Sequence, residues 1–528
     1  MKESILYLIW FLSAVLMYAE YCYFWQLKWY RIDRFNDFIS TKQGKSLITD
    51  PYTVMRILVA IVLFAWQLRV NTMINYAILD IFIVDIIYIA YRKFKGHYRR
   101  PKLSIKAGLI IVGSLIIEYL VYAFTRNWSL VLLVSSIRLA IISFVVIGIN
   151  WTTNQIKRIY FKTAEQKLKK YPNLIKIGIT GSYGKTSVKE LLTQLLSQKY
   201  KVKCTPKNTN SDIGISKFIL ATDFSNVDIC VVEMGAYNKG DIKLVCDIVH
   251  PSIGILTAIN QQHLSLFGSI ENIQSTKYEL LYAIPKTGLA ITNADNALCM
   301  QFITDLKSKV QTFGTEVPHH PDCLIESVWS RNAGLDVQYA FNTDGVIEKM
   351  NVHPPVIGEY QAVNIAPCIL VARHLGMTSE QITTAVNKLT QPDQSIKVYE
   401  FGKAIIIDDT YNSNPDGFKA ALDLLGGFPT EKRKIVITRG MLELGTESEE
   451  LHEKIGNEIS FLAGELVIIT PDFADAMKRG IIEKYHTTVH DMYETEEIVK
   501  FVESLKNEEV VILIENRIPD VVRQLYIK

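Results

Sequence analysis

The stretch LIKIGITGSYGKTS, at residues 174–187, decides the fold of the larger part of this chain. Its first half is apolar, rich in β-branched side chains and bounded by glycine, which predicts a buried parallel strand. A glycine turn follows, and residues 188–200, VKELLTQLLSQKY, have a helical pattern. The succession of strand, glycine turn and helix predicts an α/β domain built on a mostly parallel sheet.

The glycine turn has the features of a phosphate-binding loop. At such a turn, backbone N–H groups and the dipole of the following helix both face an anion. We expect the Lys185 ammonium to reach the outer phosphates of a nucleotide and the Thr186 hydroxyl to hold Mg²⁺. Position 179 is isoleucine rather than glycine, so the loop has the shorter G-x-x-G-K-[ST] pattern. The predicted phosphate-binding residues are Gly181, Ser182, Gly184, Lys185, Thr186 and Ser187.

Polar side chains stand at the ends of further predicted strands. Glu233 ends the strand at 227–234, where a carboxylate beside a phosphate loop usually holds the Mg²⁺ of a nucleotide. His263 follows the strand at 253–260 and is a candidate ligand at the same sheet edge. The alternatives are a surface acid for Glu233 and a structural histidine for His263. Several polar strand ends together predict a ligand crevice.

The first 150 residues differ in composition from the rest. The whole chain has 528 residues, of which 49% are hydrophobic and 21% charged, and its mean hydropathy is +0.14. Nearly all long apolar runs lie before residue 150, and a membrane-spanning helix needs about 20 apolar residues. We therefore predict a membrane domain at 1–150 with about five transmembrane helices. The apolar runs lie at 1–19, 55–68, 73–91, 107–125 and 129–149.

Charge placement predicts how these helices are oriented. The long connections 25–54 and 92–106 are rich in lysine and arginine, so both are expected on the cytoplasmic side. Five spans then place the N-terminus outside and everything after residue 150 in the cytoplasm. Residues 151–170 have the pattern of a basic amphipathic helix, either lying on anionic lipid or serving as a plain linker.

Three acids fall inside the predicted spans: Asp80, Asp85 and Glu118. Such acids can mark a proton or substrate path, or they can face a neighbouring helix or the interface, and we favour the second interpretation. The net charge is +3, which gives no reason to expect nucleic acid as a partner. None of the seven cysteines forms a C-x-x-C pair, so a zinc or redox site is not expected.

A set of motifs extends the phosphate loop into a longer pattern. They are TGSYGKTS (180–187), NTNSDIG (208–214), VVEMGAYNKGDI (231–242), QHLSLFGSIENIQSTKYEL (262–280), ITNADN (291–296), TFG (312–314), GEYQAVN (358–364), DDTYNSNP (408–415) and LELGTESEELH (442–452). With these motifs, residues 171–528 resemble the Mur ligase family, ATP-dependent ligases that add amino acids or dipeptides to the peptidoglycan precursor. The resemblance is greatest to the branch that adds D-alanyl-D-alanine. It implies a central ATP-binding domain at 171–392 and a Rossmann-like C-terminal α/β domain at 393–528.

The resemblance also implies a reaction and roles for single residues. In the family, ATP phosphorylates a carboxylate and an amine attacks the acyl phosphate. Lys185, Lys277 and His263 match catalytic positions. Lys277 matches a lysine that is carbamylated, and Thr186, Glu233, His263 and the carbamylated Lys277 would hold two Mg²⁺ ions. The matched nucleotide contacts are Asn293, Asp409, Tyr411 and Asn412, and the matched substrate-loop residues are Asn208 and Asn210.

The chain departs from the family at both ends. Family members begin with a small domain that holds a UDP-sugar, whereas this chain has the predicted spans, so we expect a lipid-linked muramoyl peptide or another acceptor presented at the inner leaflet of a bacterial cytoplasmic membrane. The C-terminal part has Ile514-Glu515-Asn516-Arg517 where the family has Lys-Gly-Ser-Arg. The amine donor, an amino acid or a dipeptide, is therefore left open.

Two other functions remain as alternatives. One is a capsule-type ligase that builds a poly-amino acid such as poly-γ-glutamate, and product length would distinguish it. The other is a catalytically inactive, nucleotide-regulated membrane scaffold, which the presence of Lys185, Glu233, His263 and Lys277 argues against. A transporter is weaker still, because its only support is the three acids inside the spans.

Overall fold

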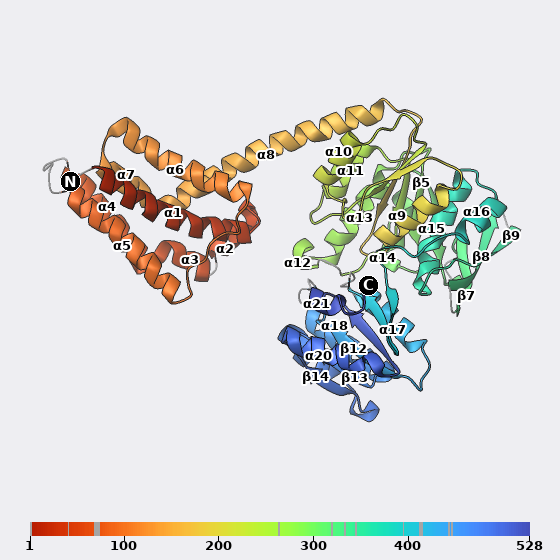
Figure 1. The fold of residues 1–528 in the computed structure, drawn as a ribbon. Helices are drawn as coiled ribbons and strands as arrows, with labels where there is room; N and C mark the ends of the chain where they lie inside the picture. Colours follow the sequence, from red (N-terminus) through yellow and green to blue (C-terminus); the bar gives the residue numbers. More distant parts are fainter. Residues whose placement is uncertain are drawn as a thin grey trace. The chain divides into compact units, whose positions relative to one another are not determined.

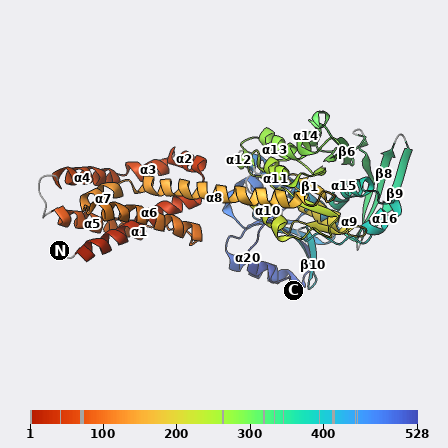
Figure 2. The same ribbon diagram turned by 90° about the horizontal axis from the view of Figure 1, so that it is seen from above.

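A computed structural model describes residues 3–40, 42–67, 74–261, 264–317, 320–331, 334–343, 346–393, 395–410, 415–441, 444 and 447–527. It divides into two compact units, Met1–Ile159 and Tyr160–Lys528, which we describe separately (Figure 1). The N-terminal unit is helical, and the larger unit contains two β-sheets with helices around them (Figure 2).

The N-terminal unit consists of apolar helices. Its helices are α1 (Glu3–Leu27), α2 (Ile32–Ser40), α3 (Lys42–Thr49), α4 (Pro51–Gln67), α5 (Ile74–Phe94), α6 (Ile105–Thr125), α7 (Trp128–Ser135) and the first part of α8 (Arg138–Lys169). Among the described residues, α1, α5, α6 and α8 are long and apolar enough to cross a membrane, whereas α4 is apolar but shorter. The last predicted span is divided between α7 and α8. Because α8 continues to Lys169, the amphipathic segment expected at 151–170 is not a separate helix.

Buried ion pairs hold α4, α5, α6 and α8 together. Arg56 Nε lies 2.8 Å from Asp85 Oδ1, and Arg138 Nε lies 2.8 Å from Glu118 Oε1. All four side chains are buried, so two cations and two anions balance inside the bundle. Asp85 and Glu118 thus face neighbouring helices, the interpretation favoured from the sequence, while Asp80 is exposed.

The first sheet of the larger unit has nine strands in the order β2-β3-β1-β4-β5-β6-β7-β8-β9. The strands β1 to β6 pair in parallel, and β7, β8 and β9 form an antiparallel extension. The strands are β1 (Ile175–Thr180), β2 (Val202–Cys204), β3 (Ile229–Glu233), β4 (Ile253–Leu256), β5 (Leu289–Asn293), β6 (Lys309–Gly314), β7 (Cys323–Arg331), β8 (Gly334–Thr343) and β9 (Val346–Val352).

Two apolar cores cover the faces of this sheet. One face packs against α9, α15 and α16, and the other packs against α10, α11 and α13. The helices of this part are α9 (Lys185–Leu196), α10 (Asp212–Ala221), α11 (Asp241–Val249), α12 (Leu264–Phe267), α13 (Ile270–Ala283), α14 (Ala297–Met300), α15 (Tyr360–His374) and α16 (Ser379–Val386). The second core also includes Ala164 and Leu168 from the end of α8, which are buried.

The second sheet has six strands in the order β10-β11-β15-β12-β13-β14, all parallel except β10 at one edge. The strands are β10 (Lys397–Phe401), β11 (Ala404–Asp409), β12 (Arg433–Thr438), β13 (Glu465–Ile468), β14 (Thr488–Asp491) and β15 (Val510–Glu515), and the helices are α17 (Pro415–Gly426), α18 (Ser448–Leu462), α19 (Ala474–Gly480), α20 (Thr495–Ser504) and α21 (Asp520–Arg523). Helices cover both faces, as in a Rossmann-like domain.

Apolar N-terminal helices followed by two mostly parallel α/β sheets confirm the predicted fold class. The predicted domain limits, 1–150, 151–170, 171–392 and 393–528, stay a prediction. The continuous helix α8 runs through the first of these limits, and its last residues pack within the larger unit.

Candidate active site

The phosphate loop joins β1 to α9 as predicted. Gly184 has φ +78° at the N-terminus of α9, a conformation that favours glycine. A Cβ atom on Gly181 would lie 2.0 Å from Thr257 Oγ1, so only glycine lets the loop approach β4 this closely. No described side chain caps the start of α9, so its first N–H groups are available for an anion.

Lys185 lies over this loop. Its Nζ donates hydrogen bonds to the carbonyl oxygens of Gly181, at 2.7 Å, and Ser182, at 2.9 Å. Burial lowers the pKa of Lys185, and the nearby Glu233 carboxylate partly opposes that effect. The cation is thus held where it can exchange carbonyl partners for phosphate oxygens.

Glu233 is the centre of a buried polar cluster at the end of β3. Its Oε2 accepts from Thr186 Oγ1 at 3.1 Å and from Lys189 Nζ at 3.0 Å, and its Oε1 accepts from Asn210 Nδ2 at 3.1 Å. Burial disfavours the charged form, but Lys189, Lys185 and the Asn210 amide outweigh it and lower the pKa of Glu233. The carboxylate is therefore ionised beside the phosphate loop.

Lys277 comes to the same place from a helix, α13. It is buried, and burial together with the positive charge of Lys185 lowers its pKa to about 7. It lines a cavity of about 60 Å³ with four other predicted site residues, Gly181, Ser182, Lys185 and Asn210. The remaining lining residues are Gly235, Ala236 and Tyr237. A neutral amine is available here at neutral pH, which is the form that reacts with electrophiles.

A second cavity, of about 280 Å³, lies beside the phosphate loop. The predicted residues Gly184, Ser187 and Asn293 line it, and Asn293 Nδ2 donates to the Thr257 carbonyl at 3.2 Å. Sequence reasoning assigned no role to the other lining residues, among them Tyr183, Asp295, Phe313, Tyr360, Asn364 and Asp416. Five of these belong to quoted motifs, which was the available signal: TGSYGKTS contains Tyr183, ITNADN contains Asp295, TFG contains Phe313, and GEYQAVN contains Tyr360 and Asn364. Aromatic rings beside polar groups suit a flat heterocycle.

The second sheet contributes to this cavity through α17. Asp416 Oδ2 accepts a hydrogen bond from Asn260 Nδ2 at 2.6 Å, which joins the first turn of α17 to the segment after β4. Both residues lie within the larger unit, so one cavity has walls from both of its sheets.

Buried carboxylates meet at the carboxyl edge of the second sheet. The predicted nucleotide contact Asp409 is opposite Glu515 in the register of β11 and β15, and both are buried. Burial and the charges of Asp409 and Asp408 raise the pKa of Glu515 well above its usual range. Asp409 is not among the described residues that line either cavity.

The other predicted site residues divide into two groups. Asn208 is exposed and, unlike Asn210, is absent from the described lining of both cavities. His263, Tyr411 and Asn412 lie outside the described residues. The structure thus brings together the phosphate loop, Glu233, Lys277, Asn210 and Asn293.

These donors fit Mg²⁺ bound together with a nucleotide. Thr186 and Glu233 offer oxygen atoms beside the phosphate loop. The described residues contain no group of three or more His, Cys, Asp and Glu that could enclose a metal. Mg²⁺ commonly takes only one or two protein oxygens and completes its shell with phosphates and water, so two protein donors are sufficient.

Comparison with known proteins gives two domain matches. Residues 179–372 match the Mur ligase middle domain, and residues 396–514 match the Mur ligase, glutamate ligase domain. Among curated relatives, the UDP-N-acetylmuramoyl-tripeptide–D-alanyl-D-alanine ligase of Synechocystis sp. is 31% identical over 309 residues, which are 58% of this chain and 64% of the relative. The same-named ligase of Bacillus subtilis is 28% identical over 285 residues, 54% of this chain and 60% of the relative. The chain therefore spans less than two thirds of these relatives.

Solved structures match the larger unit in fold. MurF from Acinetobacter baumannii has a TM-score of 0.62 and 23% identity, covering 70% of this chain and 79% of that one. The MurF ligase of Thermotoga maritima in complex with ADP has a TM-score of 0.60 and 25% identity, covering 70% of this chain and 82% of that one.

Proposed function

This chain carries the middle and C-terminal domains of the Mur ligase family, and from this premise we propose that it is an ATP-dependent carboxylate–amine ligase. The γ-phosphoryl group of ATP would move to a carboxylate oxygen of the acceptor and release ADP. The amine nitrogen would then attack the acyl carbon, lose a proton and displace inorganic phosphate. The observation that carries the proposal is one 60 Å³ cavity lined by the phosphate loop, Lys185, Lys277 and Asn210, with Glu233 bonded to Asn210.

The positions of the charged residues fit the electrostatic demand of the first step. An acceptor carboxylate that approaches a triphosphate meets strong like-charge repulsion. Lys185 would turn from the loop carbonyls to the phosphate oxygens, while Thr186 and Glu233 would hold Mg²⁺. Bound Mg²⁺ neutralises phosphate charge during phosphoryl transfer.

Lys277 would act as a carbamate. Its buried neutral amine would attack carbon dioxide, forming an N–C bond and releasing a proton, so that the neutral amine becomes an anionic carbamate that can bind a second Mg²⁺. The pKa of about 7 supports this step because a large fraction of the amine is neutral at physiological pH. A neighbouring cation, Lys185, would stabilise the resulting negative charge.

The larger cavity would hold the adenosine part of ATP. Its size, its aromatic residues Phe313 and Tyr360 and its position beside Gly184 support this assignment. The wall that Asp416 contributes comes from the second sheet, so nucleotide binding would link both sheets and help exclude water from the acyl phosphate.

We further propose that the enzyme is a multi-pass protein of the bacterial cytoplasmic membrane, with its N-terminus outside and both α/β domains in the cytoplasm. The apolar helices α1, α5, α6 and α8 support this by length and composition. In the sequence they directly precede the Mur ligase middle domain, and from this we infer a lipid-linked muramoyl peptide as acceptor. Tethering to the membrane raises the local concentration of such an acceptor.

The decisive experiment supplies the purified full-length protein with ATP, an amine panel of amino acids and dipeptides including D-alanyl-D-alanine, and one of two acceptors. One acceptor is a lipid-linked muramoyl peptide and the other is its soluble UDP-linked counterpart. ADP release with the lipid-linked acceptor is expected, and the product mass identifies the amine. Turnover with the soluble acceptor alone would contradict the lipid-linked assignment but not the ligase activity. A product carrying many residues would instead support the capsule-type alternative.

A further inference from the structure

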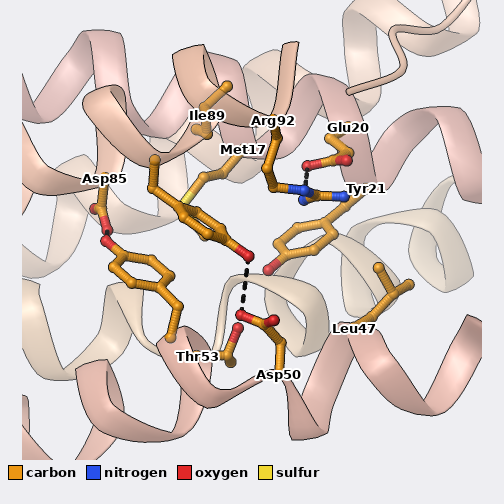
Figure 3. Close-up of a pocket in the computed structure, with 11 residues that line it drawn as sticks. Met17, Glu20, Tyr21, Leu47, Asp50, Thr53, Asp85, Ile89 and Arg92 are labelled. Carbon is orange, nitrogen blue, oxygen red and sulfur yellow. Dashed lines mark hydrogen bonds and ion pairs between the residues drawn. The ribbon is translucent and has the colours of Figure 1, made fainter. Parts of the chain in front are cut away.

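A polar cavity of about 100 Å³ lies inside the N-terminal unit, lined by residues from α1, α3, α4 and α5 and the connection before α4 (Figure 3). The ligase chemistry makes no use of this cavity, and only the placement of the cavity relative to lipid rests on the membrane location proposed above. A water molecule occupies about 30 Å³ of liquid volume, so the cavity has room for a small polar group.

The acids of the cavity outnumber its bases. Glu20, Asp50 and Asp85 line it, and the one basic residue in the lining is Arg92. Asp85 is neutralised by Arg56, and Glu20 Oε2 accepts from Arg92 Nη1 at 2.8 Å (Figure 3). Asp50 has a hydrogen bond from the Tyr88 hydroxyl at 3.0 Å but, in the described part of the chain, no cation within ion-pair distance. The cavity therefore has an excess of negative charge.

Glu20 provides a second and independent indication of a ligand. The residue is only 3% exposed, and its Oε1 has no hydrogen-bond partner among the described residues. A buried carboxylate oxygen without a hydrogen-bond donor is unfavourable, and a bound donor removes that penalty. A ligand that donates hydrogen bonds would satisfy this oxygen.

Aromatic rings complete the lining. The rings of Tyr52 and Tyr88 stack with centroids 4.1 Å apart, and Tyr21 also lines the cavity. The Tyr52 hydroxyl donates to Asp85 and the Tyr88 hydroxyl donates to Asp50, so both donors are already used by acids. Ring faces and carboxylates both attract cations, and their combination disfavours an anion.

The cavity lies near the ends of its helices. Asp50 directly precedes α4, and Arg92 is in the last turn of α5. Asp50 lies in the connection 25–54 and Arg92 begins the connection 92–106, and both connections are predicted on the cytoplasmic side. A group bound here would lie at the level of lipid headgroups rather than at the bilayer centre.

From this geometry we propose that the cavity is a binding site for a primary ammonium group, with Asp50 and Glu20 as its anionic partners and Tyr21, Tyr52 and Tyr88 as its walls. The ammonium carries up to three N–H donors, which match the Glu20 Oε1 atom and the Asp50 carboxylate. Two sources share this chemistry: the headgroup of an aminophospholipid such as phosphatidylethanolamine, and a free small amine.

The test uses the full-length protein in detergent and measures retained lipid by native mass spectrometry after exchange into equal mixtures of phosphatidylethanolamine and phosphatidylglycerol. A parallel arm titrates free ethanolamine and follows the melting temperature. Preference for phosphatidylethanolamine identifies the lipid source, and stabilisation by ethanolamine without that preference identifies a free amine. Equal retention of both lipids with no response to ethanolamine would overturn the proposal.

Two variants and one matched control assign the effect to the cavity. Asp50→Asn removes the unpaired charge and should weaken ammonium binding about tenfold or more, as expected for loss of a charge-assisted bond. Tyr88→Phe removes the hydroxyl that orients Asp50 and should weaken ammonium binding less than Asp50→Asn does. The control is Asp80→Asn, because Asp80 is an exposed acid on the same helix as Tyr88. If Asp50→Asn fails to fold, the ammonium binding of Tyr88→Phe is compared with that of the wild type instead. If Asp80→Asn weakens ammonium binding as much as the cavity variants do, the site assignment is contradicted.

Discussion

Thr186 Oγ1 donates a hydrogen bond to Glu233 Oε2 across 3.1 Å, joining the first turn of α9 to the carboxyl end of β3. The two residues are far apart in sequence, yet the parallel pairing of β1 with β3 brings the phosphate loop and the carboxylate to one sheet edge. This pair of oxygens is where the proposed ligase would hold Mg²⁺.

Glu233→Gln should therefore remove most of the ligase activity. The amide keeps the shape of the side chain but has lost the charge that would bind Mg²⁺, and loss of one such electrostatic group costs on the order of 100-fold in rate. ADP release at saturating ATP and varied Mg²⁺ is the measurement. Glu271→Gln, at an exposed acid in the first turn of α13, is the control and should be unchanged.

Lys185→Ala should abolish ATP turnover while leaving the fold intact. Its Nζ donates to the carbonyls of Gly181 and Ser182 within the loop, and Lys185 is not a member of the apolar cores formed by the described residues, so its loss removes charge without opening a core. We expect a rate reduction on the order of 100- to 1,000-fold. Phosphate release by a malachite-type assay checks it, with exposed Lys201→Ala as control. Unchanged phosphate release would refute the assignment of the phosphate loop.

Lys277 should carry a carbamate whose formation depends on pH. Burial and Lys185 lower the pKa of Lys277 to about 7. Below that pH the ammonium form dominates and cannot attack carbon dioxide, whereas above it the neutral amine is available. Activity after dialysis against carbon dioxide-free buffer should recover on adding bicarbonate at pH 8 more fully than at pH 6.

A direct measurement accompanies this prediction. ¹³C NMR of protein equilibrated with ¹³C-bicarbonate should show one carbamate signal that disappears in Lys277→Ala and persists in the exposed control Lys286→Ala. The activity of Lys277→Ala should recover in part with a small carboxylate such as acetate, which can enter the vacated space. Full activity of the variant without any addition would rule out the carbamate.

Glu515→Gln should stabilise the protein at neutral and alkaline pH. Burial and the neighbours Asp409 and Asp408 raise the pKa of Glu515. In the unfolded state Glu515 loses its proton above its ordinary pKa of about 4.5, whereas in the folded state it keeps the proton to higher pH. Between the ordinary and the raised pKa, this residue therefore makes the free energy of unfolding fall as pH rises. The glutamine variant does not titrate, so its stability lacks this pH dependence. Its free energy of unfolding should exceed that of the wild type by about 1–3 kcal/mol at pH 8 and by little at pH 4.5.

Thermal melting of full-length protein across this pH range checks the sign. Glu503→Gln, at an exposed acid on α20, should leave the pH dependence as it is. A variant that melts below the wild type at pH 8 would show that ionised Glu515 has a stabilising partner.

Arg138→Leu should destabilise the helical unit strongly, and Arg138→Leu with Glu118→Leu should recover part of the loss. The single change leaves Glu118 buried without its 2.8 Å partner, which typically costs about 3–5 kcal/mol. Replacing both residues removes the Glu118 carboxylate together with the Arg138 guanidinium, so that Glu118 is no longer left as a buried charge without Arg138. Melting in detergent of the single and double variants measures the difference. A double variant no more stable than Arg138→Leu would assign the main role of Arg138 to its other contacts.

The local chemistry of the phosphate loop was predictable from the sequence because periodicity and glycine placement determine it. The meeting of Thr186 with Glu233 was predictable as well, since parallel strands place their carboxyl ends at one edge. The position of Lys277 was not, because a buried lysine on a helix has no periodic signature and only the family motif indicated it. Phe313 and Asp416 come to one cavity through packing of distant segments, which no local pattern contains.

In the helical unit, the sequence indicated which acids lie within apolar runs, but not which acid has a carboxylate oxygen without a hydrogen-bond donor. Asp85 and Glu118 interrupt apolar runs and were noticed, and their partners Arg56 and Arg138 interrupt the same kind of run. Glu20 was missed because it directly follows the first run, in an aromatic stretch typical of an interface. Its unsatisfied oxygen depends on the packing of α1 against α5, which composition does not specify.

The end of α8 limits how this protein can be divided. Ala164 and Leu168 are buried in the apolar core beside α10, α11 and α13, and Lys167 Nζ donates to the Leu220 carbonyl at 2.8 Å. A soluble ligase cut at residue 170, where the predicted linker ends, would lose these contacts and expose apolar surface. A cut at Tyr160 keeps them. The apolar helices and the α/β unit are therefore not exchangeable modules, because the last ten residues of α8, 160–169, belong to the α/β unit and contribute to its core.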